Sequence, residues 1–260
     1  IKLLRGWARI FSIPAWLAMA GASHADPEIM VHEGDLAERG ELVATLHGNY
    51  TPKGDRQRDD GTWPTHRLSS LMAEFATGLA PGWEAGIHLP FMRAGIDSDT
   101  SQRGDWGASA VMFRLKHIRR QESGLFYGFN AEYDINAKRY VADPRSIEFR
   151  GIVGFDAEHF RVTANPHLIW GFGRSGGDHA PDFNIDWKVL HKASADFAWG
   201  AELYTDWGKA GHLHPGQGDR TLYLVSEAET ALGSVHLGIG RGYKETPERT
   251  IVKLVWSNSF

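Results

Sequence analysis

Charged side chains that could handle a polar solute recur along this chain at every second position. In the run 125–135, Asn130, Glu132 and Asp134 alternate with aromatic and aliphatic residues. Successive side chains of a β-strand point to opposite faces, so this spacing places the polar groups together on one face. Opposite charges facing each other across an enclosed space could orient a passing solute, or could neutralise one another as a structural network. The pattern leaves both roles open.

The same alternation recurs in most segments after residue 40. On their polar face, as candidates to line a lumen, we expect Glu74, Glu84, His88, Asn130, Glu132, Asp134, Glu148, Arg150, Arg161, Asn165, His167, Asp186, Lys188, Glu202 and Lys253. Acidic groups outnumber basic ones in this set, and an acid-rich lumen would favour cations. The excess alone is too small to decide selectivity.

Catalytic and metal-binding patterns are weaker in this sequence. A lipid-hydrolysing barrel would need a serine and a histidine on its lipid-facing side near one rim. His88, His167 and His236 fall on the polar parity instead, which disfavours an enzyme. His212 and His214 could offer two imidazoles to a cation from a predicted loop, but no third ligand can be named. We therefore expect no catalytic residues, no metal site and no cofactor.

The first 25 residues have the three parts of a secretory signal peptide. Basic residues at positions 2, 5 and 9 precede an apolar stretch over 10–22, and Ser23-His24-Ala25 forms a small-x-small cleavage site. The apolar stretch is shorter than the roughly 20 residues that a bilayer-spanning helix needs. We expect export, cleavage after Ala25, and a short periplasmic or plug-like N-terminal segment over 26–40.

Composition narrows the class of the exported chain. It has 30 Gly, 10 Trp, 13 Phe, 7 Tyr and no Cys, so a small domain held by disulfides is excluded. Residues 1–25 carry three basic and no acidic side chains, so their removal changes the net charge from −4 to −7, which argues against a nucleic-acid partner. No later apolar run is long enough for a membrane helix, so a mature chain inserted in a membrane must be a β-barrel.

Twelve strand-like segments follow residue 40, with connections that alternate in length. Links after even-numbered segments are short or moderate: 81–82, 117–123, 156–159, 191–194 and 231–234. Links after odd-numbered segments are mostly longer and rich in Gly, Asp and Pro: 53–64, 94–103, 136–145, 172–181, 208–218 and 244–248. Outer-membrane barrels have short periplasmic turns and longer extracellular loops. We therefore predict an all-β fold over 41–260, a transmembrane, antiparallel, up-and-down β-barrel of about 12 strands with periplasmic termini.

Two features test this interpretation against a soluble secreted β-sandwich. The tryptophans on the apolar parity are Trp83, Trp170, Trp187, Trp199 and Trp256. Several of them lie near predicted strand ends, where amphipathic rings favour a membrane interface. A sandwich would instead bury this apolar row against a second sheet.

The basic cluster 116–120 falls on a predicted periplasmic turn, either solvated or near lipid headgroups.

The last segment resembles a known signature. Residues 250–260 alternate and end in Phe260, with Val252, Leu254 and Trp256 on the same row and Asn258 interrupting it. This is similar to the C-terminal strand of Gram-negative outer-membrane proteins. The resemblance implies that Trp256 and Phe260 belong to the signal recognised by the barrel assembly machinery. Physically, such a strand can pair with the first strand and remove the open edge of the sheet.

A looser resemblance covers most of the mature chain. The run 68–91 is a strand, a Pro-Gly-Trp turn and a second strand, and Gly104-Asp105-Trp106-Gly107 follows it. This arrangement resembles the outer-membrane transporters grouped with phenol-degradation-pathway barrels. The resemblance implies a channel in the outer membrane, in contact with its lipids and lipopolysaccharide, but not that phenol is the solute.

The sequence therefore favours a passive channel or transporter for small solutes in the outer membrane of a Gram-negative bacterium. Two alternatives stay open: a lipid-modifying barrel enzyme, and a structural barrel whose lumen is occluded by its own side chains. The first predicts an outward-facing Ser and His cluster at a rim, and the second predicts a filled lumen. The sequence does not identify the solute.

Overall fold

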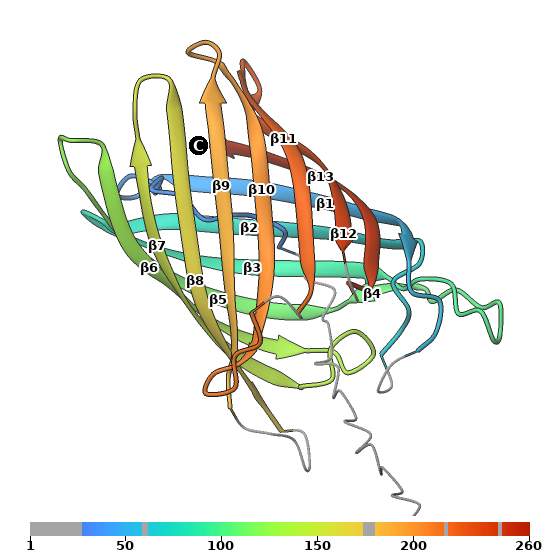
Figure 1. Ribbon diagram of the computed structural model, residues 1–260. Coiled ribbons are helices and arrows are strands. Elements are labelled where there is room, and N and C mark those ends of the chain that lie inside the picture. Colours follow the sequence, from blue (N-terminus) through green and yellow to red (C-terminus); the bar gives the residue numbers. More distant parts are fainter. Residues whose placement is uncertain (1–27, 59–61, 174–179, 216–217, 244–245) are drawn as a thin grey trace, which may run out of the picture.

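The fold of this protein is a single antiparallel sheet that closes on itself. The computed structural model describes residues 28–58, 62–173, 180–215, 218–243 and 246–260, so the predicted signal peptide lies outside the described residues. The strands are β1 Leu42–Gly54, β2 Leu68–Ala80, β3 Trp83–Arg93, β4 Trp106–Ala108, β5 Ala110–Arg120, β6 Leu125–Asn136, β7 Arg145–Asp156, β8 Phe160–Phe172, β9 Asp182–Lys192, β10 Phe197–Lys209, β11 Arg220–Thr230, β12 Gly233–Tyr243 and β13 Glu248–Ser259. Figure 1 shows them arranged as a barrel.

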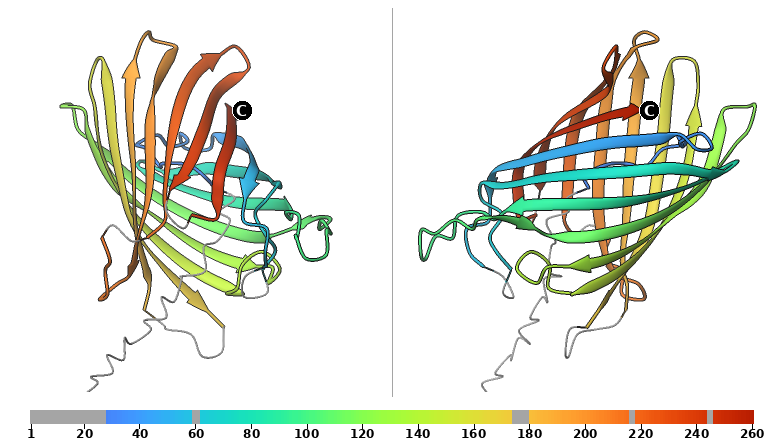
Figure 2. Two further views of the ribbon diagram at one scale, coloured as in Figure 1. Left: turned by 45° about the vertical axis from the view of Figure 1, so that its right-hand side comes forward. Right: turned by 180° about the vertical axis from the view of Figure 1, so that it is seen from behind.

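The barrel is closed by the first and last strands. β1 pairs with β2 on one side and with β13 on the other, in a register that runs from Val43 opposite Ser259 to Gly54 opposite Glu248. Beyond the Val43–Ser259 pair, Phe260 N–H donates to Leu42 O at 2.9 Å. No open edge remains, which is how a sheet satisfies its backbone groups in lipid. Every neighbouring pair is antiparallel, as the up-and-down prediction required (Figure 2).

One wall element is interrupted by a proline. β4 and β5 both pair with β3, so together they form one of twelve wall elements, with a break at Ser109. Pro90 of β3 lies opposite the break and has no N–H to donate. Its carbonyl accepts hydrogen bonds from both the N–H and the hydroxyl of Ser109, at 2.9 and 3.2 Å. The strand-like segment between the predicted links 94–103 and 117–123 is therefore divided into two strands, and the predicted count of about 12 is confirmed.

The connections alternate between the two ends of the barrel. Links of at most four residues follow β2, β5, β7, β9 and β11, and links of at least eight residues follow β1, β3, β6, β8 and β10, while the link after β12 has four. In the short turns Gly82 and Gly124 have φ of 79° and 93°, a region that glycine enters without strain. We call these the short-turn end and the long-loop end.

The basic cluster 116–120 is not a turn. It forms the end of β5, and its side chains contact different partners on the two faces of the strand. Lys116 donates to Asp35 O at 2.9 Å and Arg120 to Asp35 Oδ1 at 2.6 Å, both toward the inside. His117, on the other face, stacks on Trp83. Because basic residues lie on both faces of the strand over 116–120, the apolar and polar alternation is absent from this part of the sequence.

The outer wall is apolar and exposed. The large hydrophobic residues most exposed in mid-strand include Leu46, Leu71, Leu224 and Ile239, each more than half exposed. Trp187 and Trp199 are exposed on the same face. The sandwich alternative requires this apolar row to pack against a second sheet, and the row is exposed instead. Among the described residues, no helix is long and apolar enough to cross a membrane.

The chain before β1 runs through the inside of the barrel. Residues 28–38, which we call the luminal segment, appear in blue behind the strands in Figure 1. The backbone N–H and C=O of His32 bond the side-chain amide of Asn165 at 2.7 and 3.0 Å. Ala37 N–H donates to Glu84 Oε2 at 2.6 Å, and Lys253 Nζ donates to Ile29 O at 3.0 Å. The sequence left a periplasmic and a plug-like placement open for 26–40; residues 28–37 run through the lumen, and residues 38–40 are exposed and lead into β1.

Candidate functional site in the barrel lumen

The candidate lumen residues lie on the inner face of the wall. Buried inside the barrel are Glu74, Glu84, His88, Asn130, Glu132, Asp134, Arg150, Asn165, His167, Asp186, Lys188, Glu202 and Lys253. Glu148 and Arg161 are on the same face and slightly more exposed. They are positioned by strand parity, since every second residue of a wall strand faces inward.

The half of the lumen toward the short-turn end holds paired charges around the luminal segment. Lys188 Nζ donates to Glu33 Oε2 of that segment at 2.7 Å and also pairs with Glu227. Lys253 pairs with Glu202, and both side chains are fully buried. In such a dry environment each charge needs a partner. These pairs therefore join the luminal segment to the wall.

A cavity of about 950 Å³ lies on this side of the luminal segment. Among the described residues, nine carboxylates and five lysine or arginine side chains line it. Arg114 bridges Glu74 and Glu84, at 2.5 and 2.6 Å, and Arg161 pairs with Asp156 at 3.1 Å. Positive charge is thus concentrated in the middle and the short-turn half of the barrel.

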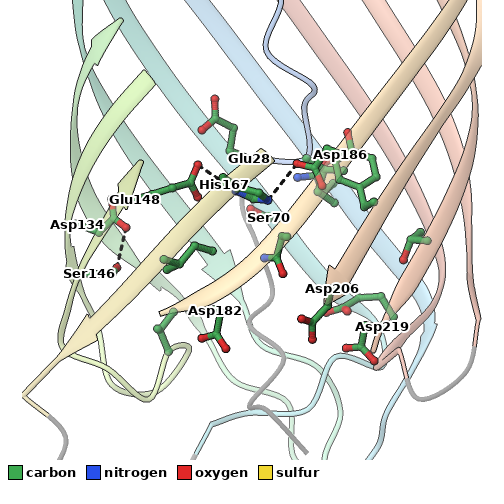
Figure 3. A pocket seen from close by; sticks show the side chains of 18 of the residues that line it. Glu28, Ser70, Asp134, Ser146, Glu148, His167, Asp182, Asp186, Asp206 and Asp219 are labelled. Atoms are coloured by element: carbon green, nitrogen blue, oxygen red, sulfur yellow. Dashed lines mark hydrogen bonds and ion pairs between the residues drawn. The ribbon is translucent and has the colours of Figure 1, made fainter. Parts of the chain in front are cut away.

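The half toward the long-loop end is more acidic. Its cavity of about 320 Å³ is lined, among the described residues, by ten carboxylates against two guanidinium groups and no lysine. Figure 3 shows Asp134, Asp182, Asp206 and Asp219 around this cavity. Several carboxylates on one wall make a negative potential that concentrates cations.

Two of these carboxylates are held by neutral donors. Asp134 accepts a hydrogen bond from Ser146 Oγ at 2.7 Å, and Asp206 accepts one from the N–H of Gly208 at 2.7 Å. Among the residues that the structure describes, neither has a lysine or arginine within ion-pair distance. Their negative charge is therefore not neutralised by a neighbouring cation of the described chain.

A further group of charges lines the same cavity, in the part nearest Glu28 of the luminal segment. Arg150 donates to Glu148 and Asp186 at 2.6 Å each, and His167 lies between the same two carboxylates at 3.3 and 3.4 Å (Figure 3). The arginine neutralises both neighbours through charge-assisted bonds. This cluster has the character of the structural network that the sequence left open.

The inner face of the wall is not polar throughout, although the sequence predicted a polar inner face. Phe126, Ile118 and Ile152 form a buried apolar cluster against Leu36 of the luminal segment. A second cluster joins Tyr223, Leu190, Val225 and Ile251 near Ile29. Because the luminal segment excludes water there, apolar side chains can face inward. The wall is polar where it is wet and apolar where it is packed.

Residues of the luminal segment and of β11 complete the site, and little in their sequence pattern indicated this. Glu28, His32 and Glu33 lack a period, and Glu227 belongs to a strand whose alternation is weak. That weakness has a cause in the structure. The ring of Tyr223 fills the space beside Gly240, where an added Cβ would lie 2.4 Å from a ring carbon. Glycine is required at this close approach.

The rim at the long-loop end is tied down by side-chain contacts. Arg58 Nε donates to Asp97 Oδ2 at 2.9 Å and its guanidinium stacks 3.8 Å from the Trp63 ring centroid. The backbone N–H of Asp99, together with Arg58, holds the pKa of the Asp97 carboxyl below its usual range. Tyr140 OH donates to Met92 O at 2.7 Å. His212 and His214 are exposed in another loop at this end.

Comparison with known proteins gives the fold class. No protein-family model matches the sequence, and no curated protein matches it. Among solved structures, an outer-membrane channel from Pseudomonas putida F1 is similar, with a TM-score of 0.64 and 13% identity over 90% of this chain and 100% of that one. The KdgM porin in complex with disordered oligogalacturonate has a TM-score of 0.55, with 8% identity over 84% of this chain and 99% of that one.

The NanC porin is similar to the same degree, with a TM-score of 0.53 and 11% identity over 84% of this chain and 98% of that one. At these identities the likeness concerns the fold. The fold is that of outer-membrane β-barrel proteins, and in particular a closed, antiparallel barrel of twelve wall strands.

Proposed function

We propose that this protein is an outer-membrane channel for small solutes, with a preference for cations. The observation that carries the proposal is the acid-rich cavity at the long-loop end, with ten carboxylates against two guanidinium groups among the described residues. The channel and porin structures of the same fold support a transport role. The proposal includes export, an outer-membrane location, short turns and termini in the periplasm, and long loops outside the cell.

The cation preference follows from where the charges lie along the barrel. A solute that enters from the long-loop end first meets carboxylates without cationic partners, such as Asp134 and Asp206. Arg150, Lys188 and Lys253, in contrast, are engaged by carboxylates deeper in the lumen. The potential felt at the entrance is therefore negative, and the paired interior adds little to it.

Single-channel recording in a planar bilayer tests the function and its selectivity together. For the refolded chain from Asp26 to Phe260, we expect small, reproducible conductance steps and a reversal potential, in a KCl gradient, that shows preference for K⁺. The double variant Asp134→Asn, Asp206→Asn should move the reversal potential toward zero. Neither substitution removes the partner of a buried cation, so the variant should fold.

The matched control removes two charges from the opposite end. Glu158 and Glu229 line the short-turn cavity and are exposed. Their replacement by glutamine should change the reversal potential less than the Asp134, Asp206 pair does. An equal change would contradict the assignment of selectivity to the long-loop cavity. A folded barrel that never conducts would overturn the channel itself.

A structural barrel with an occluded lumen is the second candidate. The luminal segment favours it, because Asn165 clamps His32 and Lys188 binds Glu33 across the lumen. This candidate predicts a folded, silent protein in the recording above. The channel predicts conductance that rises when the luminal segment is removed.

The enzyme alternative has less support. The outward histidines of the strands, His117 and His191, contact Trp83 and Trp199. Among the described residues no hydrogen bond joins a serine to either. The string Gly-x-Ser-x-Gly occurs once, at 173–177 after β8, and residues 174–177 lie outside the described residues. A nucleophile elbow requires a turn from a strand into a helix, and the next described element is the strand β9.

The assembly signal is a separate part of the proposal. Trp256 and Phe260 lie at the end of β13, and the Phe260 side chain is exposed while its backbone pairs with Leu42. We expect Phe260→Ser to lower the amount of assembled barrel in cells without preventing refolding in detergent. Unchanged assembly in cells would remove Phe260 from the signal. The same measurement on Phe197→Ser, an exposed phenylalanine at the same end, controls for lost apolar surface.

A further inference from the structure

One cluster in the lumen has the donors and spacing of a metal site. His88 of β3 is completely buried and has carboxylates on both sides of its ring. Its Nδ1 lies 3.3 Å from Glu132 Oε2 and 3.7 Å from Glu28 Oε2. Its Nε2 lies 3.7 Å from Glu74 Oε1. One ligand atom each from Glu28, Glu74 and His88 falls within 4.8 Å of the others.

The ring nitrogens of the buried imidazole are not satisfied by hydrogen bonds of good geometry within the described chain. Among the described residues, neither Nδ1 nor Nε2 of His88 has a hydrogen-bond partner, and neither does Glu132 Oε2. Buried polar atoms normally have partners, so these three call for an explanation. Glu132 also has no lysine or arginine within ion-pair distance in the part of the chain that the structure describes, which leaves a buried carboxylate short of positive charge.

A divalent cation would satisfy these atoms together. In tetrahedral zinc sites the bonds to nitrogen and oxygen are about 2.1 Å, so neighbouring ligand atoms lie roughly 3.4 Å apart. The two contacts of His88 Nδ1 are close to this spacing. A mixed set of imidazole and carboxylate favours Zn²⁺ and its neighbours in the first transition row over Ca²⁺ or Mg²⁺. Two carboxylates and one neutral imidazole would also balance the ion's charge.

We propose that His88 Nδ1, Glu28 and Glu132 bind a divalent transition-metal ion such as Zn²⁺. Glu74 accepts the proton of His88 Nε2 and orients the ring, the usual role of a carboxylate behind a metal-bound histidine. Arg114, 2.5 Å from Glu74, keeps that carboxylate on the far side of the ring. Since Glu28 belongs to the luminal segment, the ion would join that segment to β3 and β6.

His167 offers a matched comparison within the same lumen. It also lies between two carboxylates, Glu148 and Asp186, at similar distances. There Arg150 bonds both carboxylates at 2.6 Å and already supplies the positive charge. At His88, Arg114 pairs with Glu74 on the Nε2 side, and no arginine of the described chain lies within ion-pair distance of Glu132 on the Nδ1 side. His167 should therefore not bind metal.

Zinc titration of the folded full chain in detergent, after treatment with EDTA, tests the site. By calorimetry we expect one Zn²⁺ per chain, and by absorption a Co²⁺ spectrum of low-symmetry nitrogen and oxygen ligation. His88→Gln should abolish the stoichiometric binding, and Glu74→Gln should weaken it about 10- to 100-fold. His167→Gln should bind as the wild type does.

Two controls keep the result interpretable. Heat modifiability on a gel shows whether each variant is folded, and Glu132→Gln, which removes one ligand but keeps its volume, replaces His88→Gln if that variant does not fold. The double variant His212→Ala, His214→Ala removes the exposed loop pair and should leave binding intact. Absence of stoichiometric Zn²⁺ in the wild type, or binding that follows His212 and His214, would overturn the proposal.

Discussion

The two halves of the lumen differ in how their inward-facing carboxylates are held. Toward the short turns, the luminal segment fills the barrel, and Lys188 and Lys253 are paired with carboxylates. Toward the long loops the wall is more acidic, and Asp134 and Asp206 are held by a hydroxyl and a backbone N–H. No lysine or arginine among the described residues lies within ion-pair distance of either carboxylate of the second group. The paired charges join the luminal segment to the wall, whereas the unpaired carboxylates leave a net negative charge in the long-loop half.

The difference assigns separate roles to charges that look alike in sequence. Stability should depend on the paired half and selectivity on the acidic half. The luminal segment is the boundary between them, since Glu28 and Ile29 line one cavity and residues from Met30 to Ala37 line the other. Changes to the segment should therefore have the largest effect on conduction.

Deletion of residues 28–38 is expected to raise the conductance severalfold. The segment occupies the lumen between the two cavities, so its loss joins them into one water-filled path. Single-channel recording of the deletion variant and the wild type at the same salt concentration measures the change. Lys188 and Lys253 keep Glu227 and Glu202 as wall partners, so the barrel should stay closed.

A point variant separates displacement of the segment from damage to the barrel. Asn165→Leu removes both hydrogen bonds to the backbone of His32 while the wall strands stay unchanged. We expect more frequent openings of wild-type size, or larger ones, in the same recordings. An unchanged conductance in the deletion variant would show that the luminal segment does not limit the path.

The Lys253–Glu202 pair should give the largest change in stability. Both side chains are fully buried, and removing one leaves the other charge without its main partner. Lys253→Met alone should lower the free energy of unfolding by about 3–5 kcal/mol. The double variant Lys253→Met, Glu202→Leu should recover much of that loss, because no buried charge remains.

Denaturant unfolding of the refolded barrel in lipid vesicles measures this cycle. The coupling free energy comes from the two single variants and the double variant. Additive losses would mean that the pair is hydrated, and the distinction between the two halves would then fail.

The wall was predictable from sequence because its cause is local. Lipid outside and polar groups inside impose a period of two, so residues such as Glu132 and Trp187 could be assigned to a face from their neighbours alone. Local rules failed where the luminal segment intervenes. Phe126 can face inward because Leu36 of the luminal segment packs against it. Lys116 can face inward because its ammonium group donates to the backbone carbonyl of Asp35. Such contacts between distant residues leave no periodic trace.

Within the candidate site, the division into paired and unpaired charges was equally hidden. Asp134 and Glu202 have the same parity and the same chemistry in sequence. What separates them is that Lys253, on a strand far along the chain, reaches only Glu202. The register of β13 against its neighbours fixes this contact, and the register depends on the whole barrel.

Neutralising one carboxylate in each half should give the smallest effects on the free energy of unfolding, and it compares the two halves directly. Glu202→Gln removes the charge that Lys253 needs, and a lost charge-assisted hydrogen bond costs about 2–3 kcal/mol. Asp134→Asn keeps an oxygen that can accept from Ser146 Oγ and leaves no cation unpaired. Its effect on the free energy of unfolding should stay below about 1 kcal/mol.

The two variants make the same chemical change, so their difference isolates the surroundings. We expect the denaturant midpoint to fall for Glu202→Gln and to stay nearly constant for Asp134→Asn, while the reversal potential moves only for Asp134→Asn. Equal stability losses would mean that the long-loop cavity is as dry as the rest of the lumen. Its carboxylates would then be structural, because a charge that attracts solutes must be hydrated in their absence.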